Sequence, residues 1–299
     1  MIEVSVCIPT YNGEKYLKES LESIKKQTFK NIEVIISDDQ SKDNTLKIAH
    51  EFKQEVDFPV SIYTHQPQGI GANWNHCIEK AEGTYIKFLF QDDILYDTCI
   101  EEMVEIYTKY PEIGLVACKR DFIIDPDMKS EQTEIWIEKY KDLQIDYELF
   151  NESIYYLTKN VFGEISFLDG HRNKIGEPSC VMFRKDITKS IGLFDVRLKQ
   201  ILDYEYWYRI LKDNPIIVIN KPLAAFRIHG NQATHVNSTA EINDYNTYHR
   251  ILHTEYYHYL HDSLKKSLDH EFSKNNMLKK YIVKKYKSLK SKVEKWLRS

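Results

Sequence analysis

The chain has 299 residues, of which 42% are hydrophobic and 29% are charged, and its formal net charge is −4. These values are typical of an ordinary globular protein and give no sign of a disordered chain or of nucleic-acid binding. We find no basic leader, no signal peptide and no apolar run of about 18 residues that would predict a transmembrane helix. The five cysteines are scattered without a CxxC pair, which indicates buried small side chains in a reducing cytoplasm and not a zinc site.

Short apolar runs alternate with amphipathic segments over the first hundred residues. The fourth run, 84–91, is interrupted only by Lys87 and reads as a strand buried on both faces. Strands separated by helices in this way predict a doubly wound, mostly parallel α/β sheet. The crossover rule then places the ends of the first, second and fourth strands on one edge. We expect strands at 2–8, 31–37, 60–66 and 84–91, with helices at about 14–27, 45–52 and 68–83.

The remaining chain is less regular. Asp97 is a plausible N-cap for the next helix, and Pro111 lies just past its end. We expect helices at about 97–110, 142–159 and 201–211, strands within 113–125, 176–186 and 215–234, and helical structure from 238 onward.

Two pairs of adjacent carboxylates follow predicted strands: Asp38 with Asp39, and Asp92 with Asp93. Ligands of open α/β sheets bind beyond the carboxyl ends of the strands. A divalent cation together with a hydroxyl-bearing ligand would suit such a pair. A turn that caps the following helix explains the same residues, so both interpretations stay open at this point.

Four segments, taken together, resemble the family 2 glycosyltransferases, and they occur in that family's order over about residues 3–235. They are SVCIPTYNGEKYLKESLESIKKQTF, VIISDDQSKDNT, AEGTYIKFLFQDDIL and IGLFD with LDYEYWYRIL. The resemblance implies a GT-A fold and inverting transfer of a sugar from a nucleotide-sugar. The Gln-x-x-Arg-Trp motif and transmembrane helices of the processive synthases do not occur, so non-processive transfer is expected.

The resemblance also implies an organisation of the chain. Residues 1–110 would form the nucleotide-sugar-binding half and 111–237 the acceptor-binding half of one GT-A domain. Residues 238–299 would form a C-terminal helical region.

The implied nucleotide-sugar site draws on several strand ends. Tyr11 offers a ring that can stack on a pyrimidine. Asp39 can accept the imide hydrogen of uracil or thymine, which cytosine lacks, so UDP or dTDP is expected. Asn73 stands where relatives often carry Arg or Lys, and donor binding and helix capping both stay open for it. The residues assigned to this site are Pro9, Tyr11, Asn12, Glu14, Asp39, Asn73 and Asp92.

The resemblance assigns Asp92 to the ribose and Asp93 to Mn²⁺ or Mg²⁺ bridging the two phosphates. A hard divalent cation would stabilise the charge that develops on a departing nucleoside diphosphate. His229, in FRIHGNQAT, resembles a C-terminal histidine that ligates the metal in some GT-A enzymes. A loop histidine bonded to the backbone is the alternative.

Asp203 matches the acid that acts as general base in the family, where it would take the proton of the acceptor hydroxyl. Leu202 replaces the acid that usually precedes it. Glu205 competes for this role and is also assigned to the acceptor side. Trp207 could stack on an acceptor sugar or lie buried on its helix.

The C-terminal segment 282–296 has apolar residues on one helical face and lysines elsewhere. Such a helix could lie on an anionic membrane, associate with a second copy or pack against the catalytic domain. The expected protein is thus cytoplasmic or peripheral at the inner face of the membrane, and its acceptor is a lipid-linked or glycoprotein-borne glycan.

Two other functions are alternatives to sugar transfer. A non-catalytic relative that binds nucleotide-sugar or glycan as a subunit of another glycosyltransferase stays open because of Leu202 and Asn73. A nucleotidyltransferase would need a glycine-rich phosphate loop near the N-terminus, and PTYNGEKY is not one.

Overall fold

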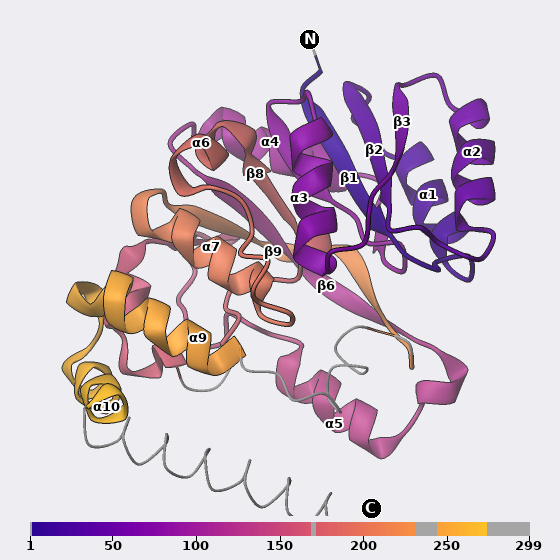
Figure 1. Ribbon diagram of the computed structural model, residues 1–299. Helices are drawn as coiled ribbons and strands as arrows, with labels where there is room; N and C mark the ends of the chain where they lie inside the picture. The colour runs from indigo at the N-terminus through magenta and orange to yellow at the C-terminus, as the bar shows by residue number, and fades with distance from the viewer. Residues whose placement is uncertain (1, 169–171, 231, 233–243, 274–299) are drawn as a thin grey trace, which may run out of the picture. The chain divides into compact units, whose positions relative to one another are not determined.

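The computed structural model describes residues 2–168, 172–230, 232 and 244–273 (Figure 1). The chain divides into two compact units, Met1–Lys159 with Gly170–Asp244 and Asn160–Asp169 with Tyr245–Ser299. The segment expected to form a basic amphipathic helix, 282–296, lies outside the described residues. Over the part of the chain that is described, no helix is both long and apolar enough to cross a bilayer.

One mixed sheet organises the first unit. Within the described residues its strands run in the order β3-β2-β1-β4-β8-β6-β9-β5, and β7 pairs with β9. Strands β1 to β4 are parallel, as are β6 and β9, whereas β5, β7 and β8 are antiparallel to their neighbours. The predicted, mostly parallel α/β sheet is confirmed. The strands are β1 (Val4–Thr10), β2 (Ile32–Asp38), β3 (Val60–Thr64), β4 (Tyr85–Phe88), β5 (Ile94–Leu95), β6 (Leu115–Ile124), β7 (Ile154–Leu157), β8 (Val181–Arg184) and β9 (Ile216–Ile228).

Helices cover both faces of this sheet. Successive residues of β1 point to opposite faces, and the apolar side chains on each face are buried by helices. Val4, Val6 and Ile8 join the apolar core together with buried residues of α1, α2 and α4. Cys7 points the other way and meets Cys77 of α3, the helix in front of the sheet in Figure 1. The helices of this unit are α1 (Leu17–Lys25), α2 (Thr45–Glu55), α3 (Ile70–Lys80), α4 (Cys99–Lys109), α5 (Glu131–Tyr140), α6 (Thr188–Ile191) and α7 (Leu202–Asp213).

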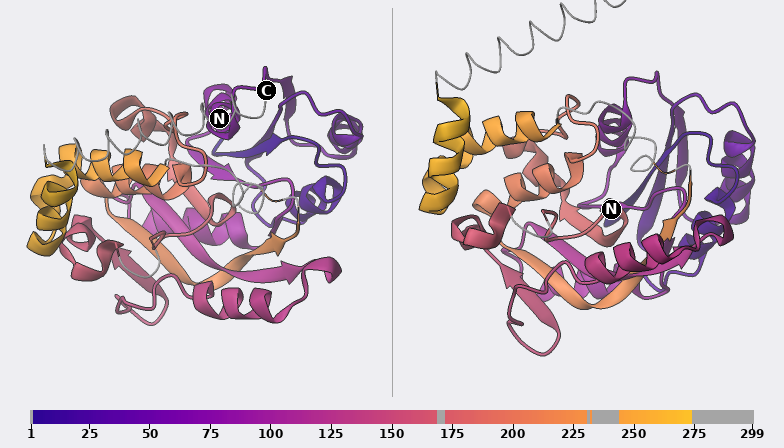
Figure 2. Two further views of the ribbon diagram at one scale, coloured as in Figure 1. Left: turned by 60° about the horizontal axis from the view of Figure 1, so that its bottom comes forward. Right: turned by 90° about the horizontal axis from the view of Figure 1, so that it is seen from below.

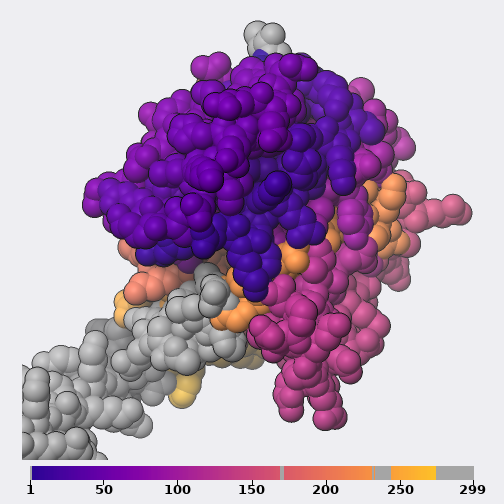
Figure 3. Space-filling model, turned by 90° about the vertical axis from the view of Figure 1, so that its right-hand side faces the viewer, coloured from indigo at the N-terminus to yellow at the C-terminus, as the bar shows by residue number. Residues whose placement is uncertain are grey.

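Strands β6 and β9 pair from one end to the other, with register shifts on both sides of Lys119, and carry the chain beyond the central core, with α5 lying beside them (Figure 2). The ring of Trp136 on α5 meets Phe122 edge-on at 5.9 Å. On the side shown in Figure 3, β9 in orange emerges between the indigo N-terminal segment and the magenta segment of β6 and α5. Residues from three distant parts of the sequence therefore meet at this end of the sheet.

The prediction of a helix near 142–159 is wrong. The helix of this region is α5, which begins after Ser130, whose hydroxyl accepts the Thr133 N–H. Residues 154–157 instead form β7 and pair with β9. Their aromatic and β-branched side chains suit a pleated surface, and this long-range pairing outweighs the local helical pattern.

The second unit is helical in its described part. Its aromatic residues pack together: Phe162 meets Phe167, Tyr256 and Tyr259 with ring centroids 5.1–6.2 Å apart. The helical segments are η2 (Lys159–Gly163), η3 (Ile165–Leu168), α9 (Asp244–Ile251), η6 (Leu252–Tyr256), η7 (Tyr257–Tyr259) and α10 (Asp262–Phe272).

Candidate active site

The two carboxylates after β4 lie in different environments. Asp93 is 1% exposed, its Oδ2 accepts the Ser179 hydroxyl at 2.6 Å, and its Oδ1 accepts the Arg227 backbone N–H at 3.0 Å. Burial, reinforced by the charge of Asp92, raises the pKa of Asp93 well above its usual range. Both oxygens are thus used inside the protein, so the prediction that Asp93 binds a metal ion conflicts with this geometry. Asp93 fastens the turn to β9 and to the segment before β8.

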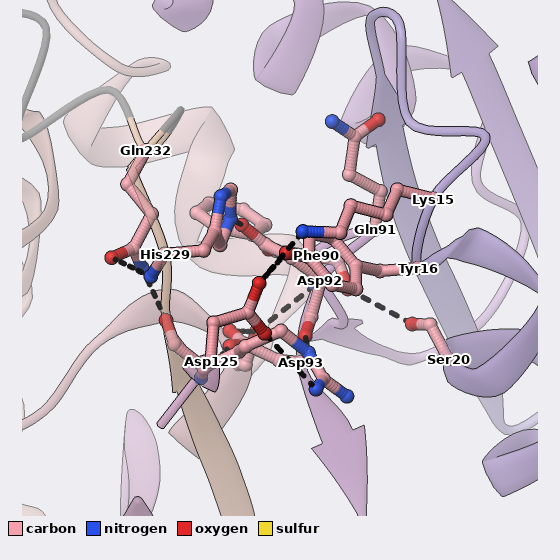
Figure 4. A network of polar contacts seen from close by, with 12 residues as sticks. Lys15, Tyr16, Ser20, Phe90, Gln91, Asp92, Asp93, Asp125, His229 and Gln232 are labelled. Atoms are coloured by element: carbon pink, nitrogen blue, oxygen red, sulfur yellow. Dashed lines mark hydrogen bonds and ion pairs between the residues drawn. The ribbon is translucent and has the colours of Figure 1, made fainter. Parts of the chain in front are cut away.

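Asp92, unlike Asp93, pairs with a histidine, His229. The His229 Nε2 lies 2.8 Å from the Asp92 Oδ2, which places a carboxylate and an imidazole together at the ends of β4 and β9 (Figure 4). The Asp92 side chain keeps 18% of its surface exposed. Arg227 also holds the turn that carries Asp92, because its Nε donates to the Asp92 backbone carbonyl at 2.9 Å. Among the described residues, no group of three His, Cys, Asp or Glu side chains could hold a metal ion.

A charged network surrounds this pair (Figure 4). Lys15 and Tyr16, which follow β1, both donate to Asp125 at the end of β6, the Lys15 Nζ at 2.8 Å. Although burial opposes it, hydrogen bonds from Lys15 and Tyr16 lower the pKa of Asp125. The Arg227 guanidinium lies 2.6 Å from Glu19 of α1. The network joins the N-terminal turn to both long strands and so fixes the surroundings of Asp92.

Gln91 ties the turn after β1 to the turn after β4 that carries Asp92 and Asp93, here called the acidic turn. Its side-chain amide accepts the Tyr11 N–H at 2.9 Å and donates to the Tyr11 carbonyl at 3.1 Å. The Tyr11 side chain is left outside, with 56% of the residue exposed. Pro9, the penultimate residue of β1, is half-buried. A flat base could therefore lie against Tyr11.

Asn12 and Glu14 mainly support the loop between β2 and α2. The Asn12 Oδ1 accepts the Lys42 N–H at 2.8 Å, and the Glu14 Oε2 accepts both N–H groups of Asn44 at 2.8–2.9 Å. Asn12 has a φ of +47°, a value that asparagine tolerates better than most residues. These contacts shape the loop, and both side chains remain exposed, so a direct role of Asn12 and Glu14 in nucleotide-sugar binding stays a prediction.

Asp39, at the end of β2, is 8% exposed and its Oδ1 lies 2.6 Å from the Nδ1 of His65. Burial raises the pKa of the Asp39 carboxyl, and the His65 bond opposes that shift. Asn73 is 4% exposed; its Nδ2 donates to the Thr10 carbonyl at 3.4 Å, while its Oδ1 has no hydrogen-bond partner in the described structure. An unpaired buried acceptor at this place suits a ligand hydroxyl or N–H.

Asp203 lies in the first turn of α7, as predicted, and its Oδ2 accepts the Asn173 side-chain amide at 3.0 Å. Burial raises the pKa of Asp203 to about 7. Glu205 is buried and forms an ion pair with Arg209 at 2.9 Å. Trp207 is 0% exposed, and its Nε1 donates to the Gly176 carbonyl at 3.1 Å. Burial excludes the predicted acceptor contacts of Glu205 and Trp207 in this structure.

The segment 173–179 connects the two groups of acids. Its first residue donates to Asp203, and its last, Ser179, donates to Asp93. Between them, Glu177 is held by Arg120 of β6 at 2.7 Å. The negative charge of Glu177 contributes to the raised pKa values of both Asp203 and Asp93, so it acts on both groups.

The family model described as "Glycosyl transferase family 2" matches residues 5–192, more than half of the chain. The chain belongs to this family. Among curated members, an uncharacterized glycosyltransferase of Rickettsia prowazekii is 30% identical over 244 residues, which cover 81% of this chain and 69% of that protein. Another, of Rickettsia typhi, is 30% identical over 231 residues, which cover 77% and 65%. The chain thus spans less than two thirds of that relative's length.

Solved structures of this family's fold resemble the chain at low sequence identity. S. aureus TarS 1-349 in complex with UDP-GlcNAc superposes with a TM-score of 0.65 at 21% identity, covering 92% of this chain and 74% of that TarS 1-349 chain. The mannosyltransferase PcManGT from Pyrobaculum calidifontis, in complex with GDP-Man and Mn²⁺, gives 0.55 at 13% identity, covering 89% and 73%. These likenesses confirm the predicted GT-A fold of this family 2 chain.

Proposed function

We propose that this chain is an inverting, non-processive glycosyltransferase that uses a UDP- or dTDP-sugar, with Asp203 as general base. The observation that carries the proposal is the segment 173–179, which joins Asp203 to the acidic turn. Acids from distant parts of the sequence are thereby held around one region of the sheet edge. Inverting transfer needs a carboxylate for the incoming alcohol, separate from the groups that stabilise the leaving diphosphate.

Asp203 suits the role of base better than its neighbours. A carboxyl with a pKa of about 7 is ionised in part at neutral pH and is more basic than an ordinary aspartate. Glu177 and Glu205 are each engaged by an arginine, at 2.7 and 2.9 Å. Because its pKa is raised, Asp203 binds a proton more readily than an ordinary aspartate, and a general base for a sugar hydroxyl needs this property.

Asp92 and His229 are the residues that would hold a divalent cation. The Mn²⁺ in the PcManGT complex supports the use of a divalent cation by a protein of this fold. A carboxylate oxygen and an imidazole nitrogen suit Mn²⁺ better than Mg²⁺, which prefers oxygen ligands only. When bound, the cation would supply charge stabilisation for the leaving diphosphate. This assignment replaces the predicted division of roles between Asp92 and Asp93.

The donor base would be read by Asp39 and Tyr11. Asp39 can accept the imide hydrogen of uracil or thymine, while His65 holds the Asp39 carboxylate from the side. The exposed Tyr11 ring offers a stacking surface, and the unpaired Asn73 Oδ1 offers an acceptor for a hydroxyl of the donor. TarS was solved with UDP-GlcNAc, which supports a uridine donor here.

The acceptor would be a hydroxyl of a growing glycan, carried by a lipid or a glycoprotein. The basic segment 282–296 would then bring the enzyme to an anionic inner-membrane surface or join two copies of the chain.

The test is release of nucleoside diphosphate from a panel of UDP-, dTDP- and GDP-sugars, with Mn²⁺ and with a chelator added. The proposal predicts slow hydrolysis of a UDP- or dTDP-sugar that the chelator abolishes. Binding of UDP by calorimetry without any hydrolysis or transfer would instead favour a non-catalytic, nucleotide-sugar-binding subunit. Hydrolysis that is indifferent to the chelator would contradict the metal assignment.

A further inference from the structure

The side-chain amide of Asn173 is completely used. Its Oδ1 accepts the backbone N–H groups of Ile175 and Gly176, each at 3.0 Å. Its Nδ2 donates to the Gly176 carbonyl and to the Asp203 Oδ2, each at 3.0 Å. Two backbone donors on one atom of the amide fix which atom is oxygen. The Nδ2 therefore points at Asp203 with no freedom to rotate away.

This arrangement determines how Asp203 is presented. A donor on one carboxylate oxygen favours the ionised form and holds the plane of the carboxylate. Gly176 itself is fixed by a second donor, the Trp207 Nε1 on α7 at 3.1 Å. The turn that carries Asn173 is thus fastened to the same helix as the base.

The charges around Asp203 make this donor consequential. From the connecting segment, Glu177 places a negative charge near Asp203, and Arg120 of β6 holds that charge in an ion pair. On α7 itself, Glu205 is engaged by Arg209, and the backbone N–H groups of Asp203 and Tyr204 favour the ionised carboxylate. Burial acts against ionisation, so each hydrogen bond to the carboxylate counts.

We propose that Asn173 is a positioning residue for the general base: its side-chain N–H orients the Asp203 carboxylate and keeps it available for the acceptor hydroxyl. The inference rests on the proposed function of Asp203. It assigns a role to a residue that does not itself touch the reacting atoms.

Asn173→Asp tests this role. Aspartate keeps the oxygen that closes the turn with Ile175 and Gly176 but loses the N–H toward Asp203, and it adds a like charge. Asn151→Asp is the matched control, because the Asn151 Oδ1 closes a similar turn by accepting the N–H groups of Ser153 and Ile154 at 2.9 and 3.2 Å. Both variants of the full chain are assayed for pH-dependent hydrolysis of the UDP-sugar that the wild type cleaves, and for UDP affinity.

The proposal predicts that Asn173→Asp shifts the acid limb of the pH–rate profile upward by about one unit or more, because a like charge raises a carboxyl pKa by that order. The rate at pH 7 then falls about fivefold or more while UDP affinity stays within about twofold. Asn151→Asp should match the wild type. An Asn173→Asp profile identical to the wild type, or an equal shift in both variants, would overturn the proposal.

If Asn173→Asp folds poorly, a double variant that exchanges the side chains at positions 173 and 203 still tests the hydrogen bond between them. In the double variant Asn173→Asp with Asp203→Asn, the new amide at 203 can donate to the new carboxylate at 173. We expect the melting temperature to return toward that of Asp203→Asn alone, with no recovery of activity. No recovery of melting temperature would contradict the hydrogen bond. An active Asp203→Asn variant would refute the base itself, a failure distinct from a silent Asn173→Asp.

Discussion

The Nε2 of His229 lies 2.8 Å from the Oδ2 of Asp92, although 137 residues separate them in the chain. Arg227, two residues before His229, holds the same turn through its backbone N–H to Asp93 and its guanidinium to the Asp92 carbonyl. The end of β9 therefore organises the acidic turn. Of the two acids, it leaves Asp92 partly exposed and buries Asp93.

Replacement of the two acids should separate these roles. Asp92→Asn removes a proposed metal ligand and should weaken Mn²⁺-dependent UDP binding by about tenfold or more, with little change in melting temperature. Asp93→Ala leaves the Arg227 N–H and the Ser179 hydroxyl unpaired and should lower the free energy of unfolding by about 1–3 kcal/mol. Calorimetry with and without Mn²⁺, together with thermal melts, measures both effects. Loss of metal-dependent binding in a folded Asp93→Ala variant, with normal binding by Asp92→Asn, would reverse the assignment.

The base-reading role of Asp39 predicts a change in selectivity. Asp39→Asn should weaken UDP binding about tenfold or more and reduce the preference for UDP over CDP, because the buried acceptor for the imide hydrogen is weakened. Asp38→Asn is the control: Asp38 is fully buried and accepts from Thr10 and Ser41, so its loss should affect stability and not the UDP to CDP ratio. Titration of the variants with both nucleotides checks this. An unchanged ratio in Asp39→Asn would remove Asp39 from the base site.

The raised pKa of Asp203 should appear in the pH dependence of stability. An unfolded aspartate titrates near pH 4, whereas the folded-state pKa of Asp203 is about 7. Between these values the folded state binds the extra proton, so the contribution of Asp203 to stability falls as pH rises and levels off above about 7. Asp203→Asn should therefore gain stability over the wild type with rising pH, on the order of 1–3 kcal/mol by pH 8. Denaturation at a series of pH values measures the difference; parallel curves for the two proteins would contradict the perturbed pKa.

The sequence predicted the parts of the fold that depend on local pattern. Strands β1 to β4 and helix α7 follow from apolar periodicity, and the position of Asp203 in the first turn of α7 follows with them. The helix expected at 142–159 was wrong because β7 is stabilised by pairing with β9, more than 50 residues away at the nearest pair, Leu157 and Ile216.

The candidate site was predicted less completely. Asp93 was assigned to the metal by resemblance to the family, because the sequence does not say which of the two adjacent acids faces the core. Asn173, His65 and Arg227 were missed because their partners lie 26 to 135 residues away and no local motif marks them. No local signal in the sequence shows what Glu177 and Ser179, just before β8, contact.

The most direct test of the account is the Asp203→Asn variant, assayed both for sugar transfer or donor hydrolysis and for UDP affinity with Mn²⁺. The account predicts that UDP affinity stays within about twofold of the wild type, because it assigns Asp203 to the acceptor hydroxyl and not to the nucleotide. Turnover should fall by about a hundredfold or more, as expected for loss of a general base. Turnover near the wild-type rate would contradict the account, because it would show that the reaction does not need Asp203 as its proton acceptor.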